Sequence, residues 1–542
     1  MKNTIPTTQY AIQLVGPGEL KLNTAKEVFT PGAQQILCKV EAVGLCFSDL
    51  KLLKQFTEHP RKGEILKGLD KAVLAEIPSY VPGTKPTVPG HEVTCRIVAI
   101  GDQVRRHTVG ERVLVQTDYR DLPTNGSCAA FGYNFEGALQ EYVLMDERVV
   151  IDPVGERFLI PVAENLSASA VCLVEPWACV EDSYVNEERN TIKAGGKLLI
   201  VTDDASFDAS RLTLPHDAKG GPAQTVVRKS TELADLANGS FDDVIAFTPS
   251  RQTVEILSDK LAGRGIINLV LAGKKIGEPA NIGVGRVHYG MTRWIGTNGS
   301  NPADSYKIIP HTGEVRDNDK VVVIGAGGPM GQMHVIRDIC SGKKNVTVIA
   351  TDMDDARLQS LAAKAEPMAK ANGASLRLVN TAKNPLTEKG SYIALMAPIP
   401  ALVAQAVKDS ATGCLINVFA GIPASTKYPI DLDTYVANGC FMFGTSGSTI
   451  RDMKIVLEKV TSGTLNTNCS VDAVSGMAGA KDGIAAVENR TLAGKIIVYP
   501  PLHDMPLIPL TELAKHYPTV ASKLEKGQWT QAAEQELLRV AK

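Results

Sequence analysis

The stretch PGHEVTCRIVAI, residues 89–100, places an imidazole and a carboxylate side by side, His91 and Glu92, just ahead of an alternating apolar strand. Cys46 lies upstream in VGLCFSDLKLL, and Glu175 lies downstream in LVEPWACVEDS. Thiolate, imidazole and carboxylate groups are the ligands of a catalytic zinc ion, which keeps one position open. Each residue also has a simpler interpretation. His91 could cap a turn, and Glu92 could be a solvated carboxylate. Cys46 could be a small buried hydrophobe, and Glu175 could lie at the start of a helix.

Length and composition describe an ordinary globular chain. Its 542 residues indicate about three domains, and 44% hydrophobic with 21% charged residues is typical of soluble proteins. A net charge of −2 provides no argument for nucleic acid or a membrane surface as partner. The ten cysteines form no CxxC pair, and neither a signal peptide nor a membrane span is evident. We expect a cytoplasmic protein.

Three pairs of segments repeat at one offset of 148 residues. GIINLVLAG at 265–273 matches GCLINVFAG at 413–421. WIGTNGSNPADSYKII from Trp294 matches MFGTSGSTIRDMKIVL from Met442, and VIAFTPSRQTVE from Val244 falls opposite YIALMAPIPALV from Tyr392. One register held over three segments indicates an internal duplication.

The front halves of the two copies differ in their glycines. IKAGGKLLIVTDD, 192–204, pairs with VRDNDKVVVIGAGGPMG, 315–331. Glycines at a strand-to-helix turn let the backbone approach a pyrophosphate at the helix N-terminus. The second copy has them, whereas TDDASFDAS in the first has none. We therefore expect the first copy to be a nucleotide-binding fold that has lost its nucleotide.

Residues 320–352 predict a Rossmann βαβ unit: a strand, a glycine loop, an amphipathic helix, a second strand and then Asp352. An acid at that point accepts hydrogen bonds from ribose and repels a 2′-phosphate, which favours NAD over NADP, although Arg357 leaves NADP open. Asp352 could instead cap a helix, and the loop allows two glycine registers. The residues expected to bind the cofactor are Gly325, Gly327, Gly328, Met330, Gly331, Asp352 and Arg357.

A series of motifs resembles, in the same order, the zinc-dependent medium-chain alcohol/polyol (sorbitol-type) dehydrogenases. These motifs are VEAVGLCFSDLKLL, the GHE turn, VGERV, GALQEYVLMDE, the EP helix, the glycine loop and TLAGKIIVYP. The resemblance covers roughly 1–184 and 315–500, while 185–314 and a stretch between Ser48 and His91 are extra. It implies an α/β protein with a GroES-like β-rich catalytic domain and tandem doubly wound parallel-sheet (Rossmann) domains, the first degenerate.

By this resemblance, Cys46, His91 and either Glu92 or Glu175 bind one catalytic zinc, and the remaining glutamate supports the site or exchanges in. Ser48 resembles the family's hydroxyl relay. The lobe of residues 116–138 contains a single cysteine, so we expect no structural zinc.

Two residues beside Ser48 complete this assignment. Asp49 resembles the acid that orients the ligand histidine, unless it merely caps a turn. Lys51 stands where many relatives carry a proton-relaying histidine, and a lysine relays protons poorly near neutral pH.

We expect an NAD(P)-dependent oxidoreductase that transfers a hydride between NAD and a secondary alcohol of a polyol or sugar, phosphorylated or not. Lys51, Lys54 and Arg61 are candidate phosphate partners, and the stretch after Ser48 is a candidate lid, whose removal (residues 55–80) would then alter the kinetics. The alternatives are a metal-free medium-chain reductase and a non-catalytic nucleotide-binding or scaffold protein.

The expected domains are 1–184, completed by about 466–504, then the degenerate repeat 185–314, the NAD-binding domain 315–465 and a helical tail 505–542. The tail has helical spacing of Leu and Ala and should pack on the chain's own surface. We expect a homo-oligomer, a dimer or a tetramer. The repeat's apolar strands must bury against something, as structural support or as a subunit contact.

Overall fold

The computed structural model describes residues 5–541 and divides them into two compact units. One unit contains the chain up to Glu181 together with the chain from Gly447 onward, and the other is Asp182–Ser446. Within the described residues, every helix is too short or too polar to cross a membrane. The predicted α/β class is confirmed.

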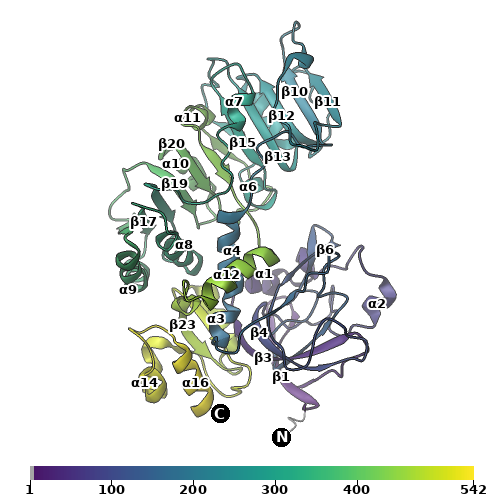
Figure 1. Cartoon of the computed structure of the whole chain (residues 1–542), viewed down its shortest axis with the longest axis vertical. Helices are drawn as coiled ribbons and strands as arrows, with labels where there is room; N and C mark the ends of the chain where they lie inside the picture. Colours follow the sequence, from purple (N-terminus) through teal and green to yellow (C-terminus); the bar gives the residue numbers. More distant parts are fainter. Residues whose placement is uncertain (1–4, 542) are drawn as a thin grey trace. The chain divides into compact units, whose positions relative to one another are not determined.

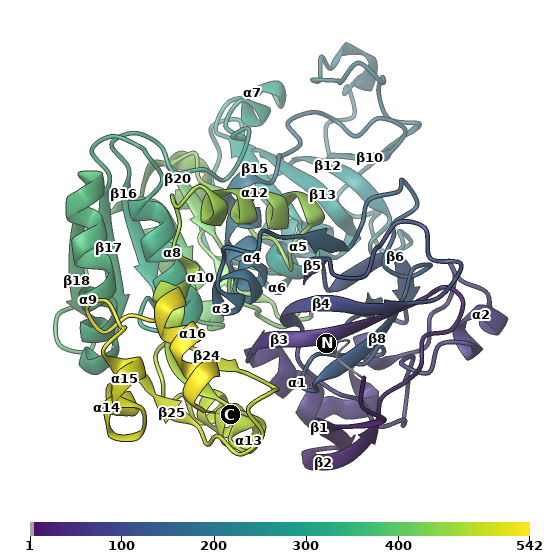
Figure 2. The ribbon, with the colours of Figure 1, turned by 60° about the horizontal axis from the view of Figure 1, so that its bottom comes forward.

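The first unit is built on an eight-stranded sheet, and Figure 2 shows β3, β4 and β8 of it close together. Its strand order is β25-β23-β24-β3-β4-β5-β9, with β8 paired to the first part of β3. Two hairpins, β1–β2 and β6–β7, complete its strands. The strands are β1 Thr8–Gly16, β2 Glu19–Glu27, β3 Gln35–Gly44, β4 Glu92–Ile100, β5 Arg112–Val115, β6 Asp118–Thr124, β7 Ser127–Ala130, β8 Tyr142–Asp146, β9 Leu159–Pro161, β23 Val471–Ser475, β24 Lys495–Val498 and β25 Ile508–Pro509.

Short helices connect these strands. The extra stretch between Ser48 and His91 folds into the end of α1, two single 3-10 turns at 56–58 and 60–62, and α2. Helix α4 runs across the boundary between the units. The helices are α1 Phe47–Gln55, α2 Lys71–Ala75, α3 Ala168–Cys172, α4 Val174–Val185, α12 Ile450–Thr461, α13 Ala480–Asn489, α14 Leu513–His516, α15 Pro518–Ala521 and α16 Gln531–Val540.

The C-terminal tail packs on the first unit, where α14–α16 lie beside β25 (Figure 2). Trp529 is fully buried, and its indole Nε1 donates to Ser169 Oγ at 3.2 Å. Glu534 of α16 accepts the backbone N–H groups of Ala168 at 2.6 Å and Ser169 at 2.8 Å. The tail therefore satisfies the free N–H groups at the start of α3.

The second unit contains one eleven-stranded sheet in the order β11-β10-β12-β13-β15-β22-β20-β19-β16-β17-β18. Figure 1 labels β10–β13 and β15 of its first half and β17, β19 and β20 of its second half. Each half is parallel, and the halves meet in the antiparallel pair β15–β22. The first half consists of β10 Lys197–Thr202, β11 Gln224–Arg228, β12 Phe241–Phe247, β13 Leu261–Val270 and β15 Arg293–Thr297, with α5 Arg251–Lys260, α6 Gly285–Tyr289 and α7 Ala303–Tyr306.

The second half is a complete doubly wound sheet. It consists of β16 Lys320–Ile324, β17 Thr347–Asp352, β18 Ser375–Asn380, β19 Gly390–Leu395, β20 Ser410–Asn417 and β22 Phe441–Phe443, with α8 Pro329–Ile339, α9 Asp355–Asn372, α10 Pro400–Lys408 and α11 Leu432–Ala437. Its central strands are apolar runs such as VVVI and YIAL, because helices cover both faces of a parallel sheet. A small ribbon pairs β14 Ala280–Ile282 with β21 Tyr428–Ile430.

Candidate metal and cofactor site

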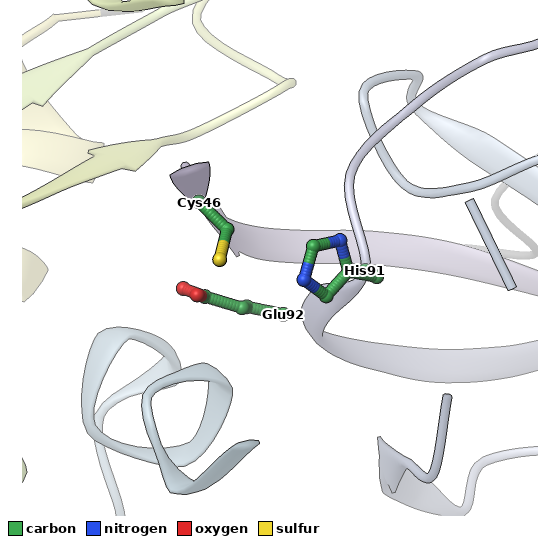
Figure 3. A group of neighbouring side chains, drawn as sticks. All are labelled: Cys46, His91 and Glu92. Atoms are coloured by element: carbon green, nitrogen blue, oxygen red, sulfur yellow. The ribbon is translucent and has the colours of Figure 1, made fainter. Parts of the chain in front are cut away.

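Cys46, His91 and Glu92 lie together in the first unit (Figure 3), with one ligand atom from each within 4.8 Å of the others. Cys46 is the N-cap residue of α1, directly after β3, and Glu92 begins the neighbouring strand β4. The antiparallel pair β3–β4 brings Gly44 opposite Glu92, so two segments far apart in sequence meet at one end of the sheet. His91 and Glu92 are buried, and Cys46 is half-buried.

Asp49 holds the two ligand-bearing segments in place. One carboxylate oxygen accepts the Cys46 backbone N–H at 3.0 Å, and the other lies 3.1 Å from His91 Nδ1. A carboxylate only accepts, so Nδ1 carries the proton and Nε2 is left for a metal. Asp49 thus both caps α1 and orients His91, which unites the two interpretations of this residue.

Electrostatics support this pairing. Burial disfavours a charge on His91, but the Asp49 carboxylate outweighs it and raises the pKa of His91 well above its ordinary value. Burial also acts to raise the pKa of Asp49, yet attraction to His91 and hydrogen bonds from His91, Cys46 and Gly90 bring that pKa below its ordinary value. Both shifts favour a charged pair of Asp49 and His91 in the metal-free chain.

The two carboxylate oxygens of Glu92 have different surroundings. Oε1 accepts from Lys495 Nζ at 2.5 Å, and both side chains are buried. Oε2 is buried and has no hydrogen-bond partner among the described residues. A buried carboxylate oxygen without a donor is costly, and a metal ion would satisfy it. The donor set and this oxygen together fit a zinc ion.

Glu175 lies near the cluster but outside that group of three. It is buried in the first turn of α4, and the Cys179 thiol, one turn later, donates to its Oε1 at 3.6 Å. Burial is the main cause that raises the pKa of Glu175 to about 7; the positive charge of His91 opposes the shift, and Glu92 adds to it. The structure therefore places Glu92, rather than Glu175, beside Cys46 and His91.

Ser48 lies beside Cys46, the candidate thiolate ligand. Its Oγ is 3.0 Å from Cys46 Sγ, and the residue is half-buried. Lys51, one turn further along α1, is exposed.

Sequence reasoning missed the aromatic and charged wall of this site. The His91 ring lies 5.9 Å from that of Tyr133, over which the Arg61 guanidinium sits at 5.4 Å. Arg61 makes a two-point ion pair with Asp118, at 2.7 and 3.1 Å. Burial raises the pKa of Tyr133 to about 12. Arg61 was a candidate from sequence, but no local signal marked Tyr133 and Asp118. The closing motif GKIIVYP already contained Lys495.

The glycine loop lies in the second unit, between β16 and α8. Gly325 has φ +83°, a conformation that favours glycine. A Cβ on Gly327 would lie 2.7 Å from Asp352 Oδ2, and one on Gly331 would lie 2.3 Å from Gly325 O, whereas one on Gly328 would meet nothing within 4 Å. The register is therefore Gly325, Gly327 and Gly331, with Gly328 as the N-cap and Met330 half-buried in the first turn of α8.

Asp352 ends β17 and is tied to the loop, because its Oδ2 accepts the Gly327 N–H at 2.9 Å. Asp354, not Asp352, caps α9 by accepting the N–H groups of Ala356 and Arg357. The helix-cap interpretation of Asp352 is thus wrong, and its side chain is placed at the loop. Arg357 lies 3.9 Å from Asp354.

The first copy has no such turn. After β10 the chain runs through a single 3-10 turn, Ala209–Arg211, to the edge strand β11. The helix that would receive a pyrophosphate is replaced by irregular chain.

Comparison with known proteins agrees with this architecture. Residues 32–154 match the alcohol dehydrogenase GroES-like domain. L-sorbose 1-phosphate reductase of Klebsiella pneumoniae is 25% identical over an alignment of 345 residues, and the match covers 55% of this chain and 77% of that protein. Mannitol-1-phosphate 5-dehydrogenase of Aliivibrio fischeri is 26% identical over an alignment of 390 residues, and the match covers 62% of this chain and 86% of that protein.

The fold has solved counterparts as well. The crystal structure of 2R,3R-butanediol dehydrogenase from Bacillus subtilis has a TM-score of 0.51 and 14% identity, and the match covers 91% of this chain and 100% of that one. The GroES-like domain and these relatives make the chain similar to medium-chain alcohol and polyol dehydrogenases, and the solved structure shows that the fold is shared. The chain is an alcohol/polyol oxidoreductase with an additional Rossmann-like copy.

Proposed function

We propose that the protein is a zinc-dependent dehydrogenase that transfers a hydride between NAD and a secondary alcohol of a polyol or sugar. The observation that carries this proposal is the group of Cys46, His91 and Glu92, in which Glu92 Oε2 is buried without a donor. When bound, zinc lowers the pKa of a substrate hydroxyl and makes hydride loss easier. Cys46, His91 and Glu92 would hold it, and Glu175, buried in the first turn of α4, is the group we propose to exchange in.

The chain's own groups position the ligands and carry the proton. Asp49 keeps the proton of His91 on Nδ1, so that Nε2 faces the metal position. Lys495 neutralises one oxygen of Glu92 and leaves the other for the ion. Ser48, with its hydroxyl next to Cys46, is the group we assign to accept the proton that leaves the substrate.

NAD is the proposed cofactor. Asp352, held at the loop by Gly327, offers a carboxylate for a ribose hydroxyl and would repel a 2′-phosphate. Arg357, the residue that left NADP open, lies beside Asp354. These contacts support NAD over NADP.

A polar substrate with several hydroxyl groups, phosphorylated or free, is proposed from the wall of the site. Arg61 and Asp118 present fixed charges near Tyr133 and His91, and such groups recognise hydroxyls. The two relatives described above are named for sugar and polyol phosphates, which supports screening phosphorylated substrates beside free ones. The free thiols of all ten cysteines support a reducing compartment such as the cytoplasm.

Metal content tests the proposal. We expect about one zinc per chain by elemental analysis of protein purified without chelator, and its loss in Cys46→Ser and His91→Ala. Cys340→Ser, in the other unit, is the matched control and should retain zinc. Wild type with zinc should reduce NAD in the presence of polyols or their phosphates. A metal-free wild type would contradict the mechanism and favour a reductase or a non-catalytic protein.

A further inference from the structure

The two copies of the repeat meet at equivalent residues. Trp294 of β15 lies opposite Met442 of β22 in the antiparallel pair at the centre of the eleven-stranded sheet. These positions are 148 apart, which is the offset of the repeated segments. Each residue therefore faces its own counterpart, as at a two-fold axis.

A second pair of strands obeys the same symmetry. In the β14–β21 ribbon, Asn281 lies opposite Pro429, again its counterpart at 148 residues. The flanking pairs are reciprocal: Ala280 lies opposite Ile430, and Ile282 lies opposite Tyr428. Two independent strand pairs thus share one pseudo-two-fold axis.

Packing off the strands is reciprocal too. A Cβ on Gly296 would lie 2.5 Å from the Val436 side chain, and a Cβ on Gly444 would lie 3.1 Å from His288 Cα. Gly296 corresponds to Gly444, and His288 corresponds to Val436, at the same offset. Each copy therefore contributes the same positions to the contact, which is the definition of an isologous interface.

The seam between the copies is buried and hydrogen-bonded. Trp294 is 1% exposed and Met442 is fully buried. The Tyr435 hydroxyl donates to Trp294 O at 2.8 Å and accepts the Met442 N–H at 2.8 Å. Beside it, Arg293 donates to Gly444 O at 3.1 Å and pairs with Glu188 at 2.7 Å. The contact resembles a domain core rather than a transient one.

This arrangement leaves the cofactor-binding half without an open edge at β22. That strand pairs with β20 on one side and with β15 on the other. An unpaired strand edge would otherwise offer its N–H and C=O groups to a second chain. The first copy retains the strands that close this edge but lacks the glycine loop.

We propose that residues 185–314 act as a covalently attached partner subunit. They occupy the self-complementary face of the cofactor-binding copy, so that one chain contains the interface that two copies would form in a dimer, and the protein is a monomer. The proposal replaces the homodimer or homotetramer expected from the sequence. It does not depend on zinc, NAD or the substrate, so its failure and that of the proposed function are distinguishable.

A designed disulfide tests the pairing within one chain. Asn281 and Pro429 are both exposed and directly opposed, and opposed positions of an antiparallel pair are at a Cα separation that a disulfide can span. Oxidised Asn281→Cys/Pro429→Cys should migrate as a single chain on a non-reducing gel, with both new thiols protected. The single variants are the controls. A cross-link between two chains, or two thiols that remain reactive after oxidation, would overturn the proposal.

The mass of wild type in solution is the second measurement and needs no variant. Light scattering should give one chain, 57.9 kDa, from micromolar to hundred-micromolar concentration. A dimer or tetramer over this range would overturn the proposal.

Discussion

The Asp49 carboxylate lies 3.1 Å from His91 Nδ1, and its second oxygen accepts the backbone N–H of Cys46. One side chain therefore sets both the tautomer of the imidazole and the position of the thiolate. Because ligand orientation is established before a metal binds, little ordering cost is left for the ion.

Asp49→Asn should weaken zinc binding by about 10- to 100-fold, because the amide supplies a weaker acceptor and can also donate, so the His91 tautomer is no longer imposed. Competition with a chromophoric chelator measures the affinity. Asp70→Asn is the control, since that side chain is exposed and makes no cap hydrogen bond. Equal zinc affinity in Asp49→Asn and wild type would refute the orienting role.

Lys495→Met should destabilise the zinc-free protein by about 3–5 kcal/mol, since it leaves the buried Glu92 carboxylate without its counter-ion. Urea unfolding in the presence of a chelator measures this change. The double variant Glu92→Gln/Lys495→Met should lose much less than the sum of the two single losses, because it removes both charges. Additive losses would show that the two residues do not act as a pair.

Gly327→Ala should cost about 1–3 kcal/mol of unfolding free energy, because the added methyl group meets the Asp352 carboxylate and the Arg357 Cβ, each at 2.7 Å. Gly328→Ala should change stability by less than about 0.5 kcal/mol, since its methyl group meets no atom within 4 Å. Chemical denaturation without cofactor measures both. The opposite order would assign the loop to the other glycine register.

Asp338 makes stability depend on pH. It is fully buried on α8, and burial, opposed by Arg337, raises its pKa to about 8. Between its unfolded pKa, about 4, and about 8, the native protein keeps a proton that the unfolded chain has lost. This group's contribution therefore falls as pH rises, by about 1.4 kcal/mol per unit, and levels off above pH 8.

Asp338→Asn should remove that slope. Urea unfolding of wild type and variant at pH 5, 6, 7 and 8 should give curves that diverge progressively, with the variant gaining relative stability at higher pH. A constant difference between the two proteins across this range would show that Asp338 does not titrate differently on folding.

Local pattern was enough for the nucleotide-binding unit. The predicted strand 320–324 and helix 329–339 are β16 and α8. They could be predicted because the apolar runs, the glycines and Pro329 that define them lie within a few residues of one another. The repeat could be predicted in the same way, because its offset of 148 residues relates strands of the first copy to strands of the second. His91, Glu92 and Cys46 could be named because the motifs around them resemble those of zinc-dependent dehydrogenases and their types suit a zinc site.

What the pattern left open depended on contacts between distant segments. The choice of Glu92 over Glu175 beside Cys46 follows from the β3–β4 register. Lys495, which pairs with Glu92, lies hundreds of residues away in the sequence, and Asp118, which pairs with Arg61, lies tens of residues away.

The sequence by itself determined the family motifs, the duplicated copies and the loss of the glycine loop in the first, because each depends on residue type and local spacing. The tertiary structure alone decided which face each copy buries. Trp294 meets Met442 only because two strands far apart along the chain approach in antiparallel register, and no local signal specifies that pairing.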